Sequence, residues 1–467
     1  MEKRISVCLL LEGTYPYITG GVSAWVHDLI KGIPEVDFIL FTISPESNQE
    51  PRYELPDNVV GHKDIVITKS YTSGKEPKKK NIILKKLKKI HEVLFTGELP
   101  DLSGFFHQMP EEYFLYADAV KSETGWEMIT SANQEKNPLY PFSDYYWAWK
   151  SAHDMLFTII GSSLPDADIY HAVSTGFAGM AGITGKFRKN RPFILTEHGL
   201  YHKEREMEIR KTKFIRGYQR DMWTKFYTNF SRFCYKYADL VISLFEENRK
   251  KQLEMNSPEE KTIVIPNGID IPRYEVQRKE KEGFHVGLVG RVVPIKDIKT
   301  FIATAKITLD SIPEALFYCI GPTDEDEMYY EDCQSLVSSL KISDNFIFTG
   351  RQDVREYYSF LDVLLLTSVR EAQPLVILEA YIAGVPVVAT RVGNIPEMLN
   401  FDDRLLASSK DAEKLAEGIQ FLHDNPEERE AMITENRKKV HEKYDRLDLH
   451  RKYHDIYSQY GDAAWQE

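Results

Sequence analysis

Cysteine is scarce in this sequence, with four among 467 residues: Cys8, Cys234, Cys319 and Cys333. The four show no paired spacing, and Cys8 and Cys319 fall within apolar runs typical of buried strands. We therefore expect buried free thiols in a reducing compartment and no disulfide framework.

Long uncharged apolar runs and an excess of positive charge are also missing. The apolar stretch 374–389 is interrupted by Glu379, so no run is long enough to span a bilayer. The N-terminus leads directly into the strand-like segment 5–11, which is too short for a signal-peptide core with a cleavage site. The formal net charge of -12 argues against a general nucleic-acid binder. These absences predict a soluble cytoplasmic protein, long enough for two or three domains.

Short apolar runs alternate with amphipathic segments along most of the chain. Such alternation predicts an α/β fold in which helices separate the strands of parallel sheets. In the first half, strands are expected at 5–11, 36–43, 168–173, 193–199, 240–243 and 263–265. After a charged linker ending near residue 283, strands are expected at 284–290, 315–320, 345–348, 361–366 and 385–389. Two doubly wound units place a ligand outside the strand carboxyl ends, in a cleft between the units.

The expected domains are 1–268 and 269–445. A C-terminal helix over 446–467 is expected to cross back to the first domain. Residues 44–165 break the alternation and are expected to form an irregular insertion. Within it, Lys78–Ile90 predicts a basic helix with an apolar stripe, suited to a membrane surface or a partner, or else a solvated helix face. The aromatic segment Ser143–Lys150 would suit sugar stacking, although such clusters are more often core.

The most informative motif is a pair of glutamates in Glu371-Ala-Gln-Pro-Leu-Val-Ile-Leu-Glu379, which follows a buried strand. If Pro374 opens a helix, Glu371 lies in the loop before it and Glu379 about a turn and a half inside it. A ligand along the helix start would meet a carboxylate at each end, with free backbone N–H groups between them for a phosphate. Taken alone, the stretch also fits a glutamate near a helix start plus a partly buried one.

Two candidate ligand-binding features of the first half of the chain lie where predicted strands end. The loop after the first strand contains Gly20-Gly21, where backbone can approach an anionic ligand closely, although many such loops are only tight turns. His198 falls at the carboxyl end of the strand 193–199, the end where ligands of parallel sheets bind, unless it is a packed interface histidine. His171 is expected to be structural.

Together these features resemble the retaining glycosyltransferases of the GT4 family, which have the GT-B fold. The resemblance is carried in the second half by Pro266-Asn-Gly-Ile-Asp270, Gly290-Arg291 with Lys296, Phe348-Thr-Gly350 and the glutamate pair. Within the family, the chain is most similar to a cytoplasmic subgroup that serves synthesis of the Pel exopolysaccharide. The segments behind that similarity include Gly13-Thr-Tyr-Pro-Tyr17, Thr196-Glu-His-Gly199 and Gly321-Pro-Thr-Asp-Glu-Asp326.

The resemblance implies a UDP-sugar donor, with UDP-glucose expected, and a carbohydrate acceptor. It also implies that domain 1–268 is the acceptor side and that domain 269–445 binds the nucleotide-sugar. Family members use the positions of Arg291 and Lys296 to grip the diphosphate, where negative charge develops. Glu379 would bind the ribose and Glu371 the donor sugar, while His198 would lie near the reacting centre. The catalytic set implied is therefore His198, Arg291, Lys296 and Glu371.

The donor-binding set implied is wider and comprises Gly20, Gly21, Asn267, Arg291, Lys296, Arg351, Glu371, Gln373, Pro374, Leu375 and Glu379. Backbone near Arg351 would face the base, and Asn267 would lie on the hinge side of the cleft. The chain departs from the family at Ala372-Gln373-Pro374, where many members have a glycine-rich sequence. Since Pro374 supplies no N–H, the Gln373 side chain is the candidate replacement donor.

No permanently bound cofactor and no metal are expected. Asp166-Ala-Asp168 fits the Asp-x-Asp pattern of metal-dependent glycosyltransferases, but it precedes its strand, so a solvated turn is expected. Besides donor and acceptor, membrane-embedded polysaccharide synthase subunits are expected partners, with recruitment to the inner face of the membrane. Two alternatives stay open: a GT-B nucleotide-sugar epimerase, which would not explain the glutamate pair, and a non-catalytic nucleotide-sugar-binding subunit of a synthase.

Overall fold

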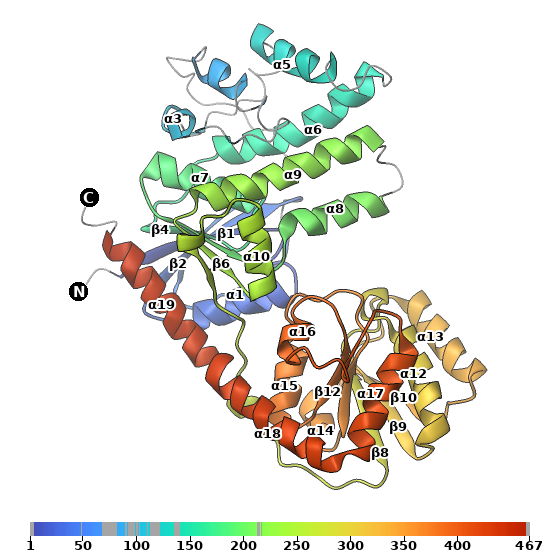
Figure 1. Ribbon diagram of the computed structural model, residues 1–467. Coiled ribbons are helices and arrows are strands. Elements are labelled where there is room, and N and C mark those ends of the chain that lie inside the picture. Colours follow the sequence, from blue (N-terminus) through green and yellow to red (C-terminus); the bar gives the residue numbers. More distant parts are fainter. Residues whose placement is uncertain are drawn as a thin grey trace. The chain divides into compact units, whose positions relative to one another are not determined.

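The computed structural model describes residues 4–47, 49–67, 82–88, 91, 99, 101, 103–109, 111–112, 122–134, 141–212, 215 and 217–463. The chain forms two compact units: in Figure 1 the first is coloured blue to green, apart from the red C-terminal segment, and the second is coloured yellow to red. The first unit comprises the chain up to Ile265 together with the part from His450 onward, and the second comprises Pro266–Leu449. The limits expected from the sequence were after residues 268 and 445, and the structure divides the chain after residues 265 and 449.

The first unit contains a parallel sheet in the order β3-β2-β1-β4-β5-β6-β7. Its described strands are β1 Ser6–Glu12, β2 Asp37–Ser44, β3 Val59–Val66, β4 Ile169–Ala172, β5 Phe193–Glu197, β6 Leu240–Ser243 and β7 Thr262–Val264. The chain moves outward in one direction from β1 to β3 and in the other from β4 to β7. The strand order therefore reverses between β1 and β4, which is where open α/β sheets bind ligands at their carboxyl edge.

Helices cover this sheet, and apolar side chains fill the space between the layers. The described helices are α1 Gly21–Gly32, α3 Ser103–Phe106, α5 Glu123–Gln134, α6 Phe142–Gly161, α7 Phe177–Lys189, α8 Tyr201–Lys211, α9 Gly217–Tyr237, α10 Glu246–Glu254, the 3-10 turn η1 Glu259–Lys261 and α19 Arg446–Ala463. α7 packs against β1, β4, α6 and α9. From His450 onward α19 belongs to this unit, where the Tyr457 hydroxyl is hydrogen-bonded to His171 Nδ1 at 2.7 Å.

The second unit repeats the plan with a parallel sheet in the order β10-β9-β8-β11-β12-β13. Its described strands are β8 Phe284–Val289, β9 Ala315–Ile320, β10 Phe346–Gly350, β11 Val363–Leu366, β12 Val387–Thr390 and β13 Leu406–Ala407. Its described helices are α11 Ile271–Tyr274, the 3-10 turn η2 Pro294–Lys296, α12 Ile298–Ser311, α13 Glu327–Ser339, α14 Val354–Tyr358, α15 Leu375–Ala383, α16 Ile395–Met398, α17 Ala412–Asp424 and α18 Pro426–Lys443. Here the strand order reverses between β8 and β11.

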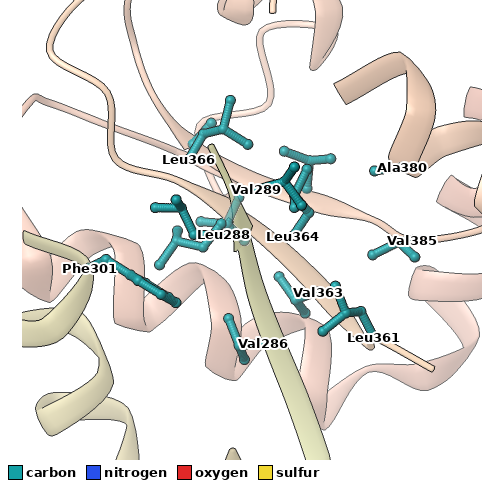
Figure 2. Close-up of a cluster of buried hydrophobic side chains, with 14 of the residues drawn as sticks. Val286, Leu288, Val289, Phe301, Leu361, Val363, Leu364, Leu366, Ala380 and Val385 are labelled. Carbon is teal, nitrogen blue, oxygen red and sulfur yellow. The ribbon is translucent and has the colours of Figure 1, made fainter. Parts of the chain in front are cut away.

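The core of the second unit explains why β8 and β11 are stretches of nearly unbroken apolar sequence. Both strands are buried on their two faces, as the central strands of a parallel sheet must be. Figure 2 shows their side chains between Phe301 of α12 on one side and Ala380 of α15 with Val385 on the other. The prediction of two doubly wound parallel sheets is confirmed.

The expectation of an irregular insertion over 44–165 is wrong in part. β3 lies inside it as the edge strand, and its exposed polar positions hid it in the sequence. The basic segment 78–90 is described over 82–88 only, where it is helical, and Ile83, Leu84 and Leu87 are buried in the core. Its apolar stripe therefore packs inside the protein. Among the described residues, no helix is long and apolar enough to cross a membrane.

The aromatic segment 143–150 divides between core and surface. Tyr145 and Trp149 are buried in a small cluster with Ile129, and the Trp149 indole donates to His91 at 2.6 Å. Trp147, on the same helix, is exposed. Most of this segment is thus structural.

Candidate functional site

Two loops of the second unit leave the sheet at its topological switch point. One follows β8 and carries η2 with Lys296, and the other follows β11 and carries Glu371. The Lys296 ammonium donates to Glu371 Oε1 at 2.6 Å, and both side chains are mostly buried. The structure thus brings together two residues that the sequence singled out 75 positions apart. A paired ammonium and carboxylate can present a cation to an anionic ligand and acceptor oxygens to hydroxyl groups.

Two hydroxyl side chains that the sequence analysis missed support this pair. Ser368 donates to the same Glu371 oxygen at 2.7 Å, while Thr367 donates to the Lys296 carbonyl oxygen at 2.8 Å. Both residues are buried, and they directly follow β11. Small hydroxyl residues at the carboxyl end of a central strand were the available signal. The hydrogen bonds from Ser368 and Thr367 hold Glu371 and Lys296 in place, in addition to the ion pair between them.

Glycine allows the loops at this edge to approach one another. Gly393 has φ +55°, and a Cβ there would lie 2.8 Å from the Ala372 oxygen and closer still to the Glu371 oxygen. Gly321, after β9, has φ +150°, and a Cβ would lie 2.7 Å from the Gly290 carbonyl carbon. Any larger residue would therefore push against the backbone that carries the site.

Glu379 lies about one turn inside α15. The helix begins at Leu375, so Pro374 precedes it instead of opening its first turn, and no side chain caps its start. Tyr358 donates to Glu379 Oε2 at 3.1 Å. Burial raises the pKa of Glu379, while hydrogen bonds from Tyr274 and Tyr358 act in the opposite direction. One short helix therefore carries both the carboxylate of Glu379 and the N–H groups of its first turn, which have no partner within the helix.

Gln373, the candidate replacement for the N–H missing at Pro374, is held by a neighbouring turn. Gln373 is buried, and its side-chain amide makes two hydrogen bonds with the backbone of Asn267, accepting from the N–H at 2.9 Å and donating to the carbonyl at 3.3 Å. Its task is to fasten the 266–270 turn to the start of α15. The side-chain oxygen of Asn267 itself is buried and has no partner among the described residues.

Arg291 and Arg351 are the outer cations of this edge. The Nη1 group of Arg291 donates to both oxygens of Glu325, at 2.6 and 2.7 Å, and both side chains are about half exposed. The remaining N–H groups of Arg291 stay available on a planar, permanently charged fork. Arg351 is exposed and directly follows β10.

The first unit places Gly20, Gly21 and His198 at its own carboxyl edge. A Cβ at either glycine would meet nothing within 4 Å, and α1 begins there without a side-chain cap. His198 directly follows β5, and burial lowers its pKa to about 4, so its ring is neutral at pH 7. His171 behaves as the structural residue expected, because Tyr457 and Thr196 hydrogen-bond both of its ring nitrogens.

Two glutamates in the first unit, Glu197, which is buried, and Glu12, which is mostly buried, escaped the sequence analysis. Glu12, the last residue of β1, accepts from the Phe177 N–H at 2.9 Å and from the Tyr201 hydroxyl at 2.7 Å. Glu197, the last residue of β5, accepts from Tyr201 N–H, Tyr235, Gln252 and Thr175. Burial raises the pKa of both carboxyls. These networks hold the starts of α7 and α8 in place, and glutamates ending apolar runs were their only sequence signal.

The Asp166–Asp168 motif has a structural role. Asp168 is buried at the start of β4 and accepts from the N–H and hydroxyl of Ser6, at 3.0 and 2.8 Å. Asp166 is exposed and pairs with Lys189 at 2.8 Å. Within the part of the chain that the structure describes, no group of three or more His, Cys, Asp or Glu residues could hold a metal ion.

Two parallel-sheet units of this topology define the GT-B fold. Solved structures agree: sucrose-phosphate synthase from Thermosynechococcus elongatus is similar with a TM-score of 0.60 at 17% identity, covering 98% of this chain and 100% of that one. HepE from Anabaena, solved in complex with UDP and glucose, has a TM-score of 0.58 at 15% identity, with the same coverage of both chains. At these identities the likeness shows the fold alone.

Sequence comparison supplies the family. The chain belongs to the family described as "Domain of unknown function (DUF3492)", whose model matches residues 5–260. Residues 273–439, which include Lys296, Glu371 and Glu379, match the family model described as "Glycosyl transferases group 1". N-acetyl-alpha-D-glucosaminyl L-malate synthase from Bacillus anthracis is 29% identical over 246 residues, which are 49% of this chain. The match spans 62% of that relative's length.

Proposed function

We propose that the protein is a retaining glycosyltransferase of the GT4 family that moves a hexosyl unit from a UDP-sugar to a growing exopolysaccharide or related acceptor. The observation that carries the proposal is the Lys296–Glu371 pair at the switch point of the second unit. It places a cation beside a carboxylate, the two groups that a diphosphate and the sugar attached to it require. The match of 273–439 to the group 1 glycosyltransferase model supports this interpretation.

The roles follow from the charge that develops during transfer. As the glycosidic bond to UDP breaks, negative charge grows on the diphosphate, where Lys296 and Arg291 would stabilise it. Glu371 would accept from hydroxyls of the donor sugar, and Glu379, one turn inside α15, from those of the ribose. His198 would act near the reacting carbon. In this proposal Gly20, Gly21, Asn267, Gln373, Pro374, Leu375 and the backbone near Arg351 line the donor.

The donor we propose to test first is UDP-glucose. HepE, a fold neighbour, was solved in complex with UDP and glucose, which supports this choice. The chain resembles the subgroup of glycosyltransferases that serves Pel synthesis and is named after PelF. This resemblance supports an exopolysaccharide acceptor. It also supports a cytoplasmic location beside membrane-embedded synthase subunits.

A thermal-shift panel of UDP, GDP and ADP sugars tests the donor class. We expect UDP and UDP-glucose to raise the unfolding temperature, and incubation with UDP-glucose to release free sugar slowly. Proton NMR of the first product should show the α anomer, as retention requires. Binding of UDP-glucose with no release and no transfer would favour a non-catalytic subunit, and a new UDP-hexose as product would favour an epimerase.

The proposal includes metal-independent transfer, because Lys296 and Arg291 supply positive charge for the diphosphate. We therefore expect release of sugar from UDP-glucose to continue in excess EDTA. Complete loss in EDTA, restored by Mg²⁺ or Mn²⁺, would contradict this part of the proposal.

A further inference from the structure

The two oxygens of the Glu371 carboxylate have different surroundings. Oε1 accepts from the Lys296 ammonium at 2.6 Å and from the Ser368 hydroxyl at 2.7 Å. A carboxylate oxygen has two lone pairs, so these two hydrogen bonds saturate Oε1. No described residue hydrogen-bonds to Oε2, and Oε2 is not among the buried unpaired atoms of this side chain, which is 14% exposed. Oε2 is therefore the oxygen of Glu371 that a ligand can reach.

The backbone around Ser368 is fixed by contacts that involve no charge. The carbonyl oxygen of Ser368 accepts from the hydroxyl of Thr390, a fully buried residue of β12, at 2.6 Å. The next residue, Val369, donates its N–H to the Ile295 carbonyl of η2 at 2.9 Å. Ser368 itself is buried. Its hydroxyl is therefore held beside Glu371 whatever the position of the Lys296 side chain.

The Lys296 ammonium is a less constant partner of Glu371 than Ser368 is. It ends a flexible four-carbon side chain that is 21% exposed, and its bond to Glu371 uses one of its three N–H groups. In the proposed function the ammonium also binds the diphosphate of the donor. Because a diphosphate and a carboxylate are both anions, they compete for this one charge. The hold of Lys296 on Glu371 therefore weakens when the donor arrives.

We propose that Ser368 is a positioning residue for the donor sugar. Its hydroxyl holds Oε1 of Glu371 while Lys296 binds the diphosphate, and Oε2 then accepts from a hydroxyl of the sugar. Ser368 acts only through Glu371, and that the ligand is a sugar rests on the proposed function. A serine suits this task because its hydroxyl donates a hydrogen bond without adding a charge beside the diphosphate.

The decisive substitution is Ser368→Ala, which removes the hydroxyl and keeps a small side chain. We expect kcat/KM for release of sugar from UDP-glucose to fall roughly tenfold, since the lost hydrogen bond is to a charged group, and UDP affinity to stay unchanged. Ser368→Thr, which restores a hydroxyl, should recover most of the loss. Ser359→Ala is the matched control, because this buried serine of the same unit donates to the Glu356 carbonyl instead.

Two results of these measurements would overturn the proposal. Unchanged kcat/KM in Ser368→Ala would show that Glu371 does not need the hydroxyl. Weaker binding of UDP itself would show that the substitution disturbs the loop as a whole, because UDP carries no sugar for Glu371 to bind.

A double-mutant cycle without ligand tests the contact itself. Urea titrations compare Ser368→Ala, Glu371→Ala and the double variant with the wild-type protein. We expect the double variant to lose less stability than the two single variants together, because the hydroxyl and the carboxylate are partners. Additive losses would overturn the proposal. Absence of UDP binding by the wild-type protein would refute the proposed function, and with it the sugar as ligand, whereas the cycle would still decide whether Ser368 holds Glu371.

Discussion

At the scale of single residues, the proposed function depends most on the side chain of Lys296. Its ammonium is held by Glu371 at 2.6 Å, and its backbone is held by Thr367. A charge fixed in this manner needs little reorganisation when a diphosphate arrives, which is the condition under which a single cation contributes most.

We expect Lys296→Ala to weaken UDP binding and to reduce turnover roughly a hundredfold or more, since one preorganised group at a leaving group contributes about 2.7–4 kcal/mol. Calorimetry with UDP and release of sugar from UDP-glucose measure the two effects. Lys299→Ala is the control, because Lys299 is a nearby exposed lysine that pairs with Asp332. Normal UDP affinity and normal turnover in Lys296→Ala would remove this residue from the site.

The two glutamates differ in their surroundings. Glu371 accepts from Lys296 and Ser368 in the loop, whereas Glu379 accepts from Tyr358 within the helix. Their proposed ligands differ accordingly: the donor sugar for Glu371 and the ribose, which every UDP ligand carries, for Glu379.

We expect Glu379→Ala to weaken UDP and UDP-glucose binding alike, by about 1.5–3 kcal/mol for a hydrogen bond to a charged group. We expect Glu371→Ala to lower transfer while UDP affinity stays nearly unchanged, because its contacts require the sugar. Calorimetry with both ligands makes the comparison, after thermal melts have shown that both variants fold. The exposed Glu356→Ala is the control. The opposite pattern would mean that the two assignments are reversed.

At the scale of elements, the site depends on how closely loops from neighbouring strands approach. The loop after β12 contains Gly393, and Asn394 N–H donates to the Ala372 oxygen of the loop after β11 at 2.8 Å. The loops after β9 and β10 are joined in the same manner, from Gly321 N–H to the Gly350 oxygen at 3.0 Å. These links make the carboxyl edge of the second sheet one connected surface.

Two glycine variants distinguish the effect of the close approach of Gly393 to the Glu371 backbone from the effect of a positive φ angle. Gly393 and Gly384 both have positive φ, +55° and +77°, but a Cβ at Gly384, which follows α15, meets no atom closer than 3.7 Å. We expect Gly384→Ala to cost about 1 kcal/mol of stability, the usual cost of a left-handed residue, with transfer retained. Gly393→Ala should lower transfer strongly as well, because it displaces the backbone of Glu371. Equal effects of the two variants on stability and transfer would show that this contact does not position Glu371.

At the scale of the whole molecule, buried titratable groups tie stability to pH. Burial lowers the pKa of His153, His198 and His202 to about 4 and that of His171 to about 3, while it raises the pKa of Glu12, Glu197 and Glu379. Between pH 4 and 6.5 the unfolded histidines bind protons that the folded ones do not, so they contribute stability that is lost on acidification. The buried carboxyls act in the opposite direction.

His153 isolates one of these contributions, because it lies away from the sheet edge, stacked on Trp149 at 4.1 Å. We expect His153→Phe to reduce the dependence of the unfolding free energy on pH by up to about 1.4 kcal/mol per pH unit between pH 6.5 and 4, since it removes one proton from the balance. Urea titrations at several pH values measure this slope. An unchanged slope in His153→Phe would mean that His153 is not buried in its neutral form.

The described strands show how far local sequence suffices. β6 and β9 begin and end at the residues predicted; each is a short buried run that starts directly after an acidic residue, Asp239 or Glu314. β3 and β13 were missed: β3 is a half-exposed edge strand, and β13 has only two residues. At the site, Lys296 and Glu371 were predicted because their motifs are local, whereas Ser368 and Glu12 were not, because single residues of these types are common.

The sequence alone determined the α/β architecture, the two strand series and the place of the glutamate pair at a helix start, since each follows from local apolar periodicity or spacing. Only the tertiary structure decided that Lys296 meets Glu371 and that Gln373 fastens Asn267. The physical reason is that these contacts join loops following different strands. Which loops become neighbours depends on the order of strands within the sheet, and that order is set by long-range packing of the whole unit.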